Sequence, residues 1–351
     1  MSKKKLLLLF TTLLLITISG CFPTGEIRHG GNSELSPDAQ QIADNIKNFE
    51  LDLTLPEKSP ENLPMLELHI KEWDTDKVLG LLVGDEEITQ RDEYDSDHYA
   101  GEKYTVYQND NMFLSIEKGR LGYNRKTNYS QQITSALDSC YYTEPYDINC
   151  SFATREEVAA KFKELLNALG ITNLSEPDVK AVNPDFANRI LRETAPSGKF
   201  TPWTDEEIYY INFSQVYEGV PVSNYDIIRH NGEGYVSMAA KISAVFDKTG
   251  IIKLSFQNIK TPEYKKLETV SVTPPENALK TVVNHFASQK LLRYHTMFDC
   301  ELIYADVSNN NRTAYTLIPV WQFTYRTAIE GIKEQNCHRI YADNRNRLIL
   351  Q

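Results

Sequence analysis

Histidine and cysteine are the residues of this 351-residue chain best suited to metal binding or nucleophilic chemistry, so their spacing is the first guide to function. None of the seven histidines belongs to an HExxH pattern, and none of the five cysteines belongs to a CxxC pattern. Both patterns place zinc ligands or paired thiols close together, so a zinc hydrolase, a zinc ribbon or a thioredoxin-like protein has no support. His285 stands beside an apolar helical stripe, where a packed or solvated histidine is commoner than a metal ligand.

The acidic segment RDEYDSDH, residues 91–98, is a second candidate for chemistry. Oxygen ligands at alternate positions suit calcium, but the segment lacks the glycine and distal glutamate of an EF-hand loop. A solvated acidic loop is therefore favoured. No GxSxG elbow, P-loop or GxGxxG turn occurs, although paired carboxylates for glycoside hydrolysis could come from distant positions. We expect a protein that is not an enzyme and that binds neither cofactor nor metal.

Aromatic residues on expected strands are the best candidates for ligand contacts. The chain has 20 tyrosines, of which Tyr209 and Tyr217 lie in one expected strand region, and Trp321 lies in another. Aromatic side chains exposed on a sheet could stack on sugars or clasp a peptide. The alternative is that they form sheet core and cross-strand pairs, and this is favoured for Trp321, which follows a Pro-Val step in a hydrophobic run.

The N-terminus indicates where the protein resides. Lys3, Lys4 and Lys5 precede the uncharged residues 6–18, a run too short for a membrane span but typical of a secretion signal. The run ends in Ile18-Ser19-Gly20-Cys21, which resembles the bacterial lipobox. The resemblance implies cleavage before Cys21 and acylation of its sulfur, which would hold the mature protein on the extracytoplasmic face of a bacterial membrane. A plain secretory signal or an uncleaved anchor is the alternative.

Net charge and the other cysteines follow from this predicted location. Removal of residues 1–20 takes away three lysines and no acid, so the net charge changes from −11 to −14. An acidic chain without a basic aromatic patch is a poor partner for nucleic acid. The envelope permits disulfides among four further cysteines. Nearest-neighbour pairing gives Cys140–Cys150 and Cys300–Cys337, one of three connectivities, and four buried free thiols are the alternative.

Two stretches about 120 residues apart show the same order of signals. Each begins with a capping box, Thr154-x-x-Glu157 or Thr273-x-x-Glu276, followed by an apolar helical stripe. Strand-like segments follow, and the first set is broken at Glu218-Gly219. Each half closes with a hairpin, in which Gly250 of VFDKTGIIKL aligns with Asn346 of YADNRNRLIL, and both residue types tolerate left-handed turn positions. The pattern predicts two copies of a helix packed on an antiparallel sheet.

A weaker relative of this unit precedes them. MLELHI alternates as a strand, DTDKVLGLLVG is typical of a short helix capped by Asp74, and YTVYQNDNMFLSIEKGRLGY predicts two or three strands. The polar, proline-punctuated segment 172–205 receives no assignment. We expect a signal peptide, a tether, an N-terminal α+β module and two repeat units, over residues 1–20, 21–60, 61–150, 151–262 and 263–351.

The second half of the chain resembles known bacterial modules. The order of helix, GVPV strand and FDKTGII hairpin resembles PepSY-type modules of secreted proteins. LIPVWQF followed by IYADNRNRLI is similar to the YycH and YycI envelope regulators and to uncharacterised lipoproteins of Firmicutes. The resemblance covers roughly residues 154–351 and departs in the lipobox, which replaces a membrane helix. It implies an α+β fold of repeated PepSY-like units and a non-catalytic interaction or inhibitory role.

Three classes of function remain. The first is a non-catalytic module that regulates a membrane protein or envelope enzyme, with strand addition as one way to bind. The second is a lipoprotein that binds peptides or cell-wall fragments, which predicts a cleft between the repeats lined by tyrosines. The third and least favoured is an envelope hydrolase, which requires His, Asp or Glu side chains from separate modules to converge in one pocket.

Overall fold

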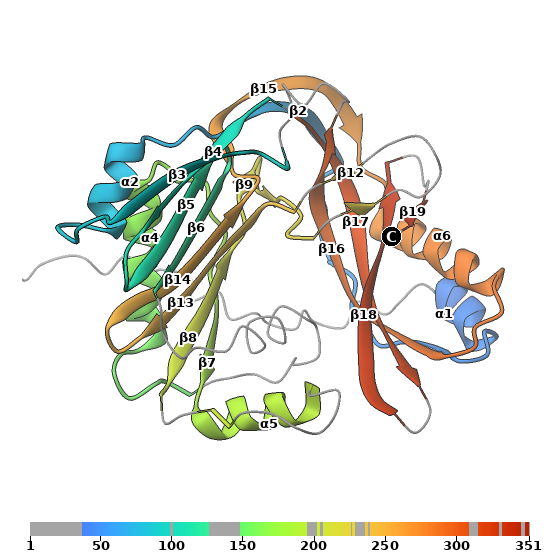
Figure 1. The fold of residues 1–351 in the computed structure, drawn as a ribbon. Coiled ribbons are helices and arrows are strands. Elements are labelled where there is room, and N and C mark those ends of the chain that lie inside the picture. Colours follow the sequence, from blue (N-terminus) through green and yellow to red (C-terminus); the bar gives the residue numbers. More distant parts are fainter. Residues whose placement is uncertain are drawn as a thin grey trace, which may run out of the picture.

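Two large and almost entirely antiparallel sheets stand opposite each other in the computed structural model of this chain (Figure 1). Four of the five described helices cover the outer faces of the sheets, whereas α5 (Pro184–Thr194) packs on Tyr210 and Val245 of the opposite face. Strands β2 (Asn62–Ile70) and β15 (Lys260–Ser271) arch from one sheet toward the other. The described residues are 37–98, 101–125, 148–194, 202–203, 206–225, 227–228, 236–237, 239–308, 315–329, 332–344 and 348–350.

The first sheet has eight strands in the order β3-β4-β5-β6-β14-β13-β8-β7. Helices α4 (Arg155–Ala168) and α2 (Thr75–Leu82) pack on its outer face, where the ring centroids of Phe162 and Phe213 lie 5.7 Å apart. Alternate residues of a strand point to opposite faces, so this face collects the apolar side chains. The strands are β3 (Gln90–Asp95), β4 (Lys103–Gln108), β5 (Met112–Glu117), β6 (Arg120–Arg125), β14 (Gly250–Gln257), β13 (Lys241–Asp247), β8 (Ile208–Phe213) and β7 (Asp178–Val182).

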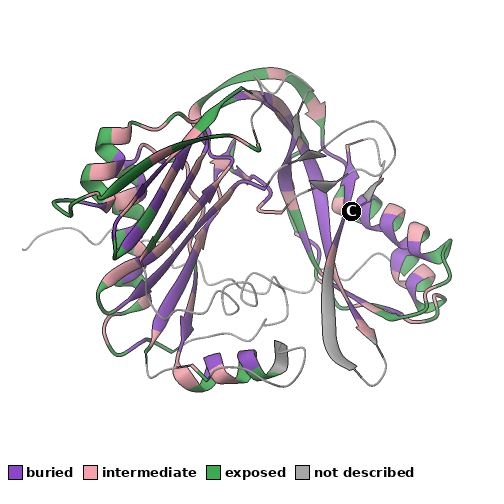
Figure 2. Cartoon of the chain, viewed as in Figure 1, coloured by how far each residue is buried: buried purple, intermediate pink, exposed green. Residues whose placement is uncertain are grey.

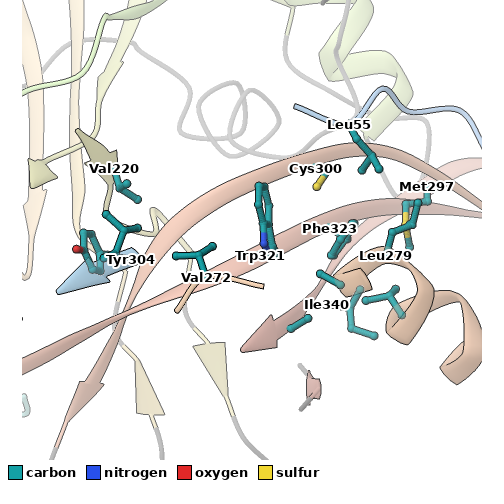
Figure 3. Packing of buried hydrophobic residues seen from close by; sticks show 14 of the residues in the cluster. Leu55, Val220, Val272, Leu279, Met297, Cys300, Tyr304, Trp321, Phe323 and Ile340 are labelled. Atoms are coloured by element: carbon teal, nitrogen blue, oxygen red, sulfur yellow. The ribbon is translucent and has the colours of Figure 1, made fainter. Parts of the chain in front are cut away.

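The second sheet has seven strands, and α6 (Pro275–Ala287) and α1 (Pro37–Asp44) cover its outer face. Trp321 and Phe323 pack on that face in one cluster with Leu279 of α6 (Figure 3). Besides β2 and β15, the strands are β1 (Phe49–Leu51), β16 (Tyr294–Ser308), β17 (Tyr315–Ile329), β18 (Ile332–Asp343) and β19 (Leu348–Leu350). Four short strands form two further hairpins, β9 (Val216–Tyr217) with β10 (Val220–Pro221), and β11 (Ile227–Ile228) with β12 (Val236–Ser237).

A buried ion pair marks the junction where the chain leaves the first sheet for the second. Lys260 Nζ lies 2.6 Å from Asp306 Oδ2, and the side chains are 0% and 2% exposed. Lys260 Nζ also donates to the carbonyl of Asn258 at 3.0 Å and lies 4.8 Å from the ring centre of Tyr315. Gln215 Nε2 donates a hydrogen bond to the carbonyl of Lys260, and Gln215 Oε1 accepts one from the backbone N–H of Lys260. The connection between the sheets is thus tied by polar contacts that are shielded from water.

The expected α+β fold of repeated PepSY-like helix-on-sheet units is wrong. Of the described residues, 48% lie in strands and 21% in helices, of which there are five. Strand β6 of the expected N-terminal module pairs with β14 of the first expected unit, so both belong to one sheet. The second sheet likewise combines β1 and β2 with strands more than 190 residues later in the chain. Strand edges accept any partner that offers backbone hydrogen bonds, and here they pair across the expected unit boundaries.

Several local predictions are confirmed. Thr154 and Glu157 form the predicted capping box, and Asp74 caps α2 by accepting from the backbone N–H of Lys77. The break at Glu218-Gly219 is the β9–β10 turn, where both residues have positive φ, at 50° and 78°. Gly250 closes the β13–β14 hairpin at φ 114°, a value that side chains rarely adopt. Asn346, its expected counterpart, lies outside the described residues.

Other local predictions are corrected. Thr273 does not cap α6; Pro274 holds the N-cap position without a side-chain bond, and Thr273 Oγ1 donates to the carbonyl of Asn344. The tether predicted over 21–60 is wrong from Pro37 onward, because α1 and β1 are part of the core. The unassigned segment 172–205 contains β7 and α5 (Pro184–Thr194). The expected acidic loop at 91–98 is largely the exposed edge strand β3, green in Figure 2.

Among the described helices, none has the length and apolar character needed to cross a membrane.

Candidate functional site

The three aromatic residues predicted to contact a ligand are core residues instead. Tyr209, Tyr217 and Trp321 are 0%, 2% and 2% exposed. Their polar atoms bond to the backbone: Tyr209 Oη donates to the carbonyl of Ala153, Tyr217 Oη to that of Thr261 and Trp321 Nε1 to that of Thr273, at 2.7–2.8 Å. A buried aromatic ring with its polar atom satisfied stabilises the core and offers nothing to a ligand. The binding roles considered for Tyr209 and Tyr217 are therefore wrong, whereas the core position favoured for Trp321 is confirmed.

The predicted Cys300–Cys337 disulfide is not compatible with the strand register. Cys300 on β16 faces Phe323 of β17, whereas Cys337 on β18 faces Arg326 on the other side of β17. Two strand spacings amount to about 10 Å, beyond the roughly 7 Å that a disulfide spans between Cα atoms. Cys300 carries a buried free thiol.

The other predicted cysteine sites are only partly described. Cys150 carries a buried free thiol that donates to the carbonyl of Ile208 at 3.4 Å, and burial raises its pKa to about 11. Cys140, its predicted disulfide partner, and Cys21, the predicted site of lipid attachment, lie outside the described residues.

A pocket of about 410 Å³ lies on the inner face of the eight-stranded sheet and is a candidate site. Its floor includes Lys180 of β7, Asn212 of β8, Lys241 of β13 and Gln257 of β14. The inner face is polar there because these residues alternate with the apolar residues that face α4. Sequence analysis missed the site, because the polar residues come from four separate strands.

A row of polar and small residues continues from this floor across six strands. In register, Asp178 faces Asn212, which faces Ser243, and the row proceeds through Ser255 and Gly122 to Ser115. A Cβ atom on Gly122 would approach Ser115 Oγ to 2.7 Å, so a larger residue at this position would displace the Ser115 hydroxyl. The inner face thus offers a flat, hydrogen-bonding surface beside the pocket.

The segment after β10 forms the wall of the pocket toward the second sheet. Asn224 Nδ2 donates to Ser214 Oγ at 2.7 Å, while Asn224 Oδ1 is buried without a hydrogen-bond partner. The ring of Tyr225 lies 3.0 Å from the guanidinium carbon of Arg339 on β18. A buried acceptor without a donor costs about 1–3 kcal/mol, which a ligand N–H could recover. The wall therefore links the pocket to the inner face of the second sheet.

Charges of both signs surround the pocket. Lys180 and Lys241 contribute cations, and Glu176 and Asp178 contribute carboxylates. Lys180 Nζ lies 3.3 Å from Asp178 Oδ2, so part of this charge is already paired. Such a lining suits a ligand that itself carries charges of both signs and amide groups.

His295 and His338 meet around one tyrosine, an arrangement that sequence analysis did not anticipate. Tyr325 stacks on His295 and on His338, with ring centroids 5.6 and 5.2 Å apart. Phe286 packs against the same group and against His285. Burial lowers the pKa of all three histidines. In the part of the chain that the structure describes, no group of three or more His, Cys, Asp or Glu residues could hold a metal ion.

Comparisons with known proteins identify a shared fold and no family. No protein-family model and no curated protein matches the sequence. The structure is similar to the crystal structure of an uncharacterized protein from Eubacterium rectale, with a TM-score of 0.63 and 13% sequence identity over 86% of this chain and 90% of that chain. At this identity the similarity shows the fold alone.

Proposed function

We propose that the protein is a lipid-anchored extracytoplasmic protein that binds a peptide or a cell-wall fragment, without catalysis, in the pocket beside the junction of its two sheets. The observation that carries the proposal is the pocket floor with its adjoining polar row, built from the inner face of the eight-stranded sheet. A volume of about 410 Å³ lies within the usual range of small-ligand sites, roughly 300–1,000 Å³.

The chemistry of the lining matches a short peptide better than an apolar or purely anionic ligand. Lys241 adds positive charge where a ligand carboxylate would lie, and the amides of Asn212 and Gln257 can bond to both N–H and carbonyl groups. Asn224 Oδ1 supplies a further acceptor for an amide N–H. Peptides and the peptide stems of cell-wall fragments present this combination of groups.

The alternative is a regulatory module that binds a partner by strand addition. The edge strand β15 is poorly suited to pair with a further strand. This long edge strand is mostly exposed, as its green colour in Figure 2 shows. Its pairing with β2 is interrupted by two irregularities. After Lys260 it carries Pro262 and four charged residues, namely Glu263, Lys265, Lys266 and Glu268. Proline, bulges and charges are the means by which proteins discourage edge pairing, so we prefer the ligand-binding proposal.

Ligand binding can be tested by calorimetry on the chain from residue 21 onward, with Cys21→Ala to keep it free of lipid. The titrants are tripeptides and soluble cell-wall fragments. Lys241→Met should weaken binding at least tenfold, whereas Lys265→Met, which removes an exposed lysine from β15, should leave it unchanged. Failure of every titrant to bind, or equal affinity in the Lys241→Met variant, would overturn the proposal.

Membrane attachment is tested separately in a bacterial host. We expect the wild-type chain in the membrane fraction, with a lipid mass on the N-terminal peptide that begins at Cys21. Cys21→Ala should release the protein from membranes, and unchanged membrane retention of that variant would contradict the lipid anchor.

A further inference from the structure

Two carboxylates emerge side by side on the inner face of the seven-stranded sheet, opposite the polar row. Asp299 and Glu301 are alternate residues of β16, so their Cα atoms lie about 7 Å apart and their side chains leave the same face. Solvent still reaches both side chains, although neighbouring protein surrounds their carboxyl groups closely enough to desolvate them in part. The pairing of β16 with β17 is irregular between Met297 and Asp299, and this bulge directs Asp299 inward while Met297 and Cys300 stay in the core on the outer face.

A buried amide beside these carboxylates has an acceptor that no described group satisfies. Gln322 of β17 is in register with Glu301 and therefore lies on the same inner face. Its side chain is 5% exposed, and its Oε1 atom has no hydrogen-bond partner. An unpaired buried acceptor costs about 1–3 kcal/mol, so a donor at this position would be stabilising.

The electrostatics of the cluster favour a cation. Desolvation, followed by repulsion from Asp299, raises the pKa of Glu301 to about 7. Desolvation also raises the pKa of Asp299, although the nearby Arg339 guanidinium and a hydrogen bond from Thr324 oppose this. A positive charge placed between the two carboxylates would relieve their repulsion.

We infer that Asp299, Glu301 and Gln322 form a binding site for the ammonium group of an amine-bearing ligand. An ammonium group has three N–H donors and no acceptor, which matches two carboxylates and one amide oxygen. A calcium ion would require six to eight oxygen ligands, more than the two carboxylates and one amide supply. The number of oxygen atoms available therefore favours the amine.

This inference rests in part on the proposed function, because it names one end of the ligand. Tyr225 lines the peptide pocket and lies against Arg339 of β18. Arg339 is in register with Thr324 of β17, and Thr324 is in register with Asp299 of β16. Two strand spacings place Arg339 about 10 Å from Asp299. Roughly three extended residues cover the distance from Asp299 to Arg339, so a peptide with its amino group at Asp299 and Glu301 would need further residues to pass Tyr225 and enter the pocket.

The amine site is tested with a simple probe that does not depend on peptide binding. Nuclear magnetic resonance of the ¹⁵N-labelled chain from residue 21, with Cys21→Ala, would follow the Gln322 side-chain amide during titration with n-butylamine at pH 8 and low salt. The neutral isostere n-butanol is the control. We expect a saturable shift with n-butylamine alone, weakened at least tenfold by Glu301→Gln and by Gln322→Leu. Glu67→Gln, which removes a half-buried carboxylate of β2 that pairs with Lys265, should have no effect.

The outcomes separate this inference from the proposed function. Absence of a saturable n-butylamine shift, or a shift that survives Glu301→Gln in a folded variant, overturns the amine site whether or not peptides bind. Peptides that bind equally well with free and acetylated amino groups would also overturn it and leave the proposed function intact. If n-butylamine binds at Gln322 while no peptide binds, the amine site stands and the peptide-binding proposal fails.

Discussion

Replacing Lys260 by methionine should destabilise the protein by about 3–5 kcal/mol at pH 7, because it leaves the carboxylate of Asp306 buried without its cation. Burial raises the pKa of Asp306, and Lys260 opposes that shift. Without the lysine, the carboxyl group would take up a proton. Protonating a carboxyl group of ordinary pKa 3.8 at pH 7 costs about 4 kcal/mol, which agrees with that range.

This reasoning makes the loss depend on pH. At pH 5 the same protonation costs only about 2 kcal/mol, so the Lys260→Met variant should recover roughly half of its lost stability. Urea unfolding followed by both fluorescence and circular dichroism at the two pH values measures this difference. At pH 7 the melting temperature should fall by roughly 4–7 °C, since an unfolding entropy of about 2.1 cal/mol/K per residue is large for a chain of this length.

Matched controls isolate burial as the cause. Lys103 and Glu93 form an ion pair with the same 2.6 Å separation, but their side chains are 58% and 53% exposed. Lys103→Met should therefore cost less than about 1 kcal/mol. The double variant Lys260→Met/Asp306→Leu, which buries no charge, should be far more stable than Lys260→Met. Equal losses for Lys260→Met and Lys103→Met, or a loss in Lys260→Met that is the same at pH 5 and pH 7, would refute the argument.

Three further predictions concern the caps, thiols and histidines. Thr154→Ala should cost about 1 kcal/mol in urea unfolding, whereas Glu276→Ala should change stability by less than about 0.5 kcal/mol, since Thr273 and Glu276 form no capping box. In folded protein at pH 8, Cys150 should resist iodoacetamide because burial raises its pKa to about 11, and labelling before unfolding would contradict its burial. Burial lowers the pKa of His338 and its neighbours in the folded protein, so below about pH 6.5 the unfolded chain binds more protons and the stability of the fold should decrease. His338→Phe should reduce this decrease. An unchanged dependence of stability on pH in that variant would exclude His338 as a contributor.

These helix caps and this tight turn could be predicted from the sequence because the residues that form each of them are close together in the chain. The Thr154–Glu157 box joins residues three positions apart, and Asp74 caps a helix that begins at the next residue. The Glu218-Gly219 turn depends on the backbone of two residues. In each case the physical interaction is complete within one short segment, so its residue types are a sufficient signal.

The assembly of the sheets was not predictable in the same way. An alternating strand such as β6 shows which of its residues are apolar but does not specify that β14, about 130 residues later, will be its neighbour. The repeat in local signals suggested separate units, whereas the strands of neighbouring units share one sheet. Apolar aromatics such as Trp321 are consistent with either a core or a binding face until the neighbouring elements are known.

The sequence by itself determined the acidic charge, the lipobox-like N-terminus and the helix caps and turns, because these depend on composition or on residues within a few positions. Only the tertiary structure decided that Asn212, Ser243 and Ser255 form one row and that Gln322 lies beside Glu301. Strand register sets these neighbours, and register results from cooperative backbone pairing and core packing between segments far apart in the chain.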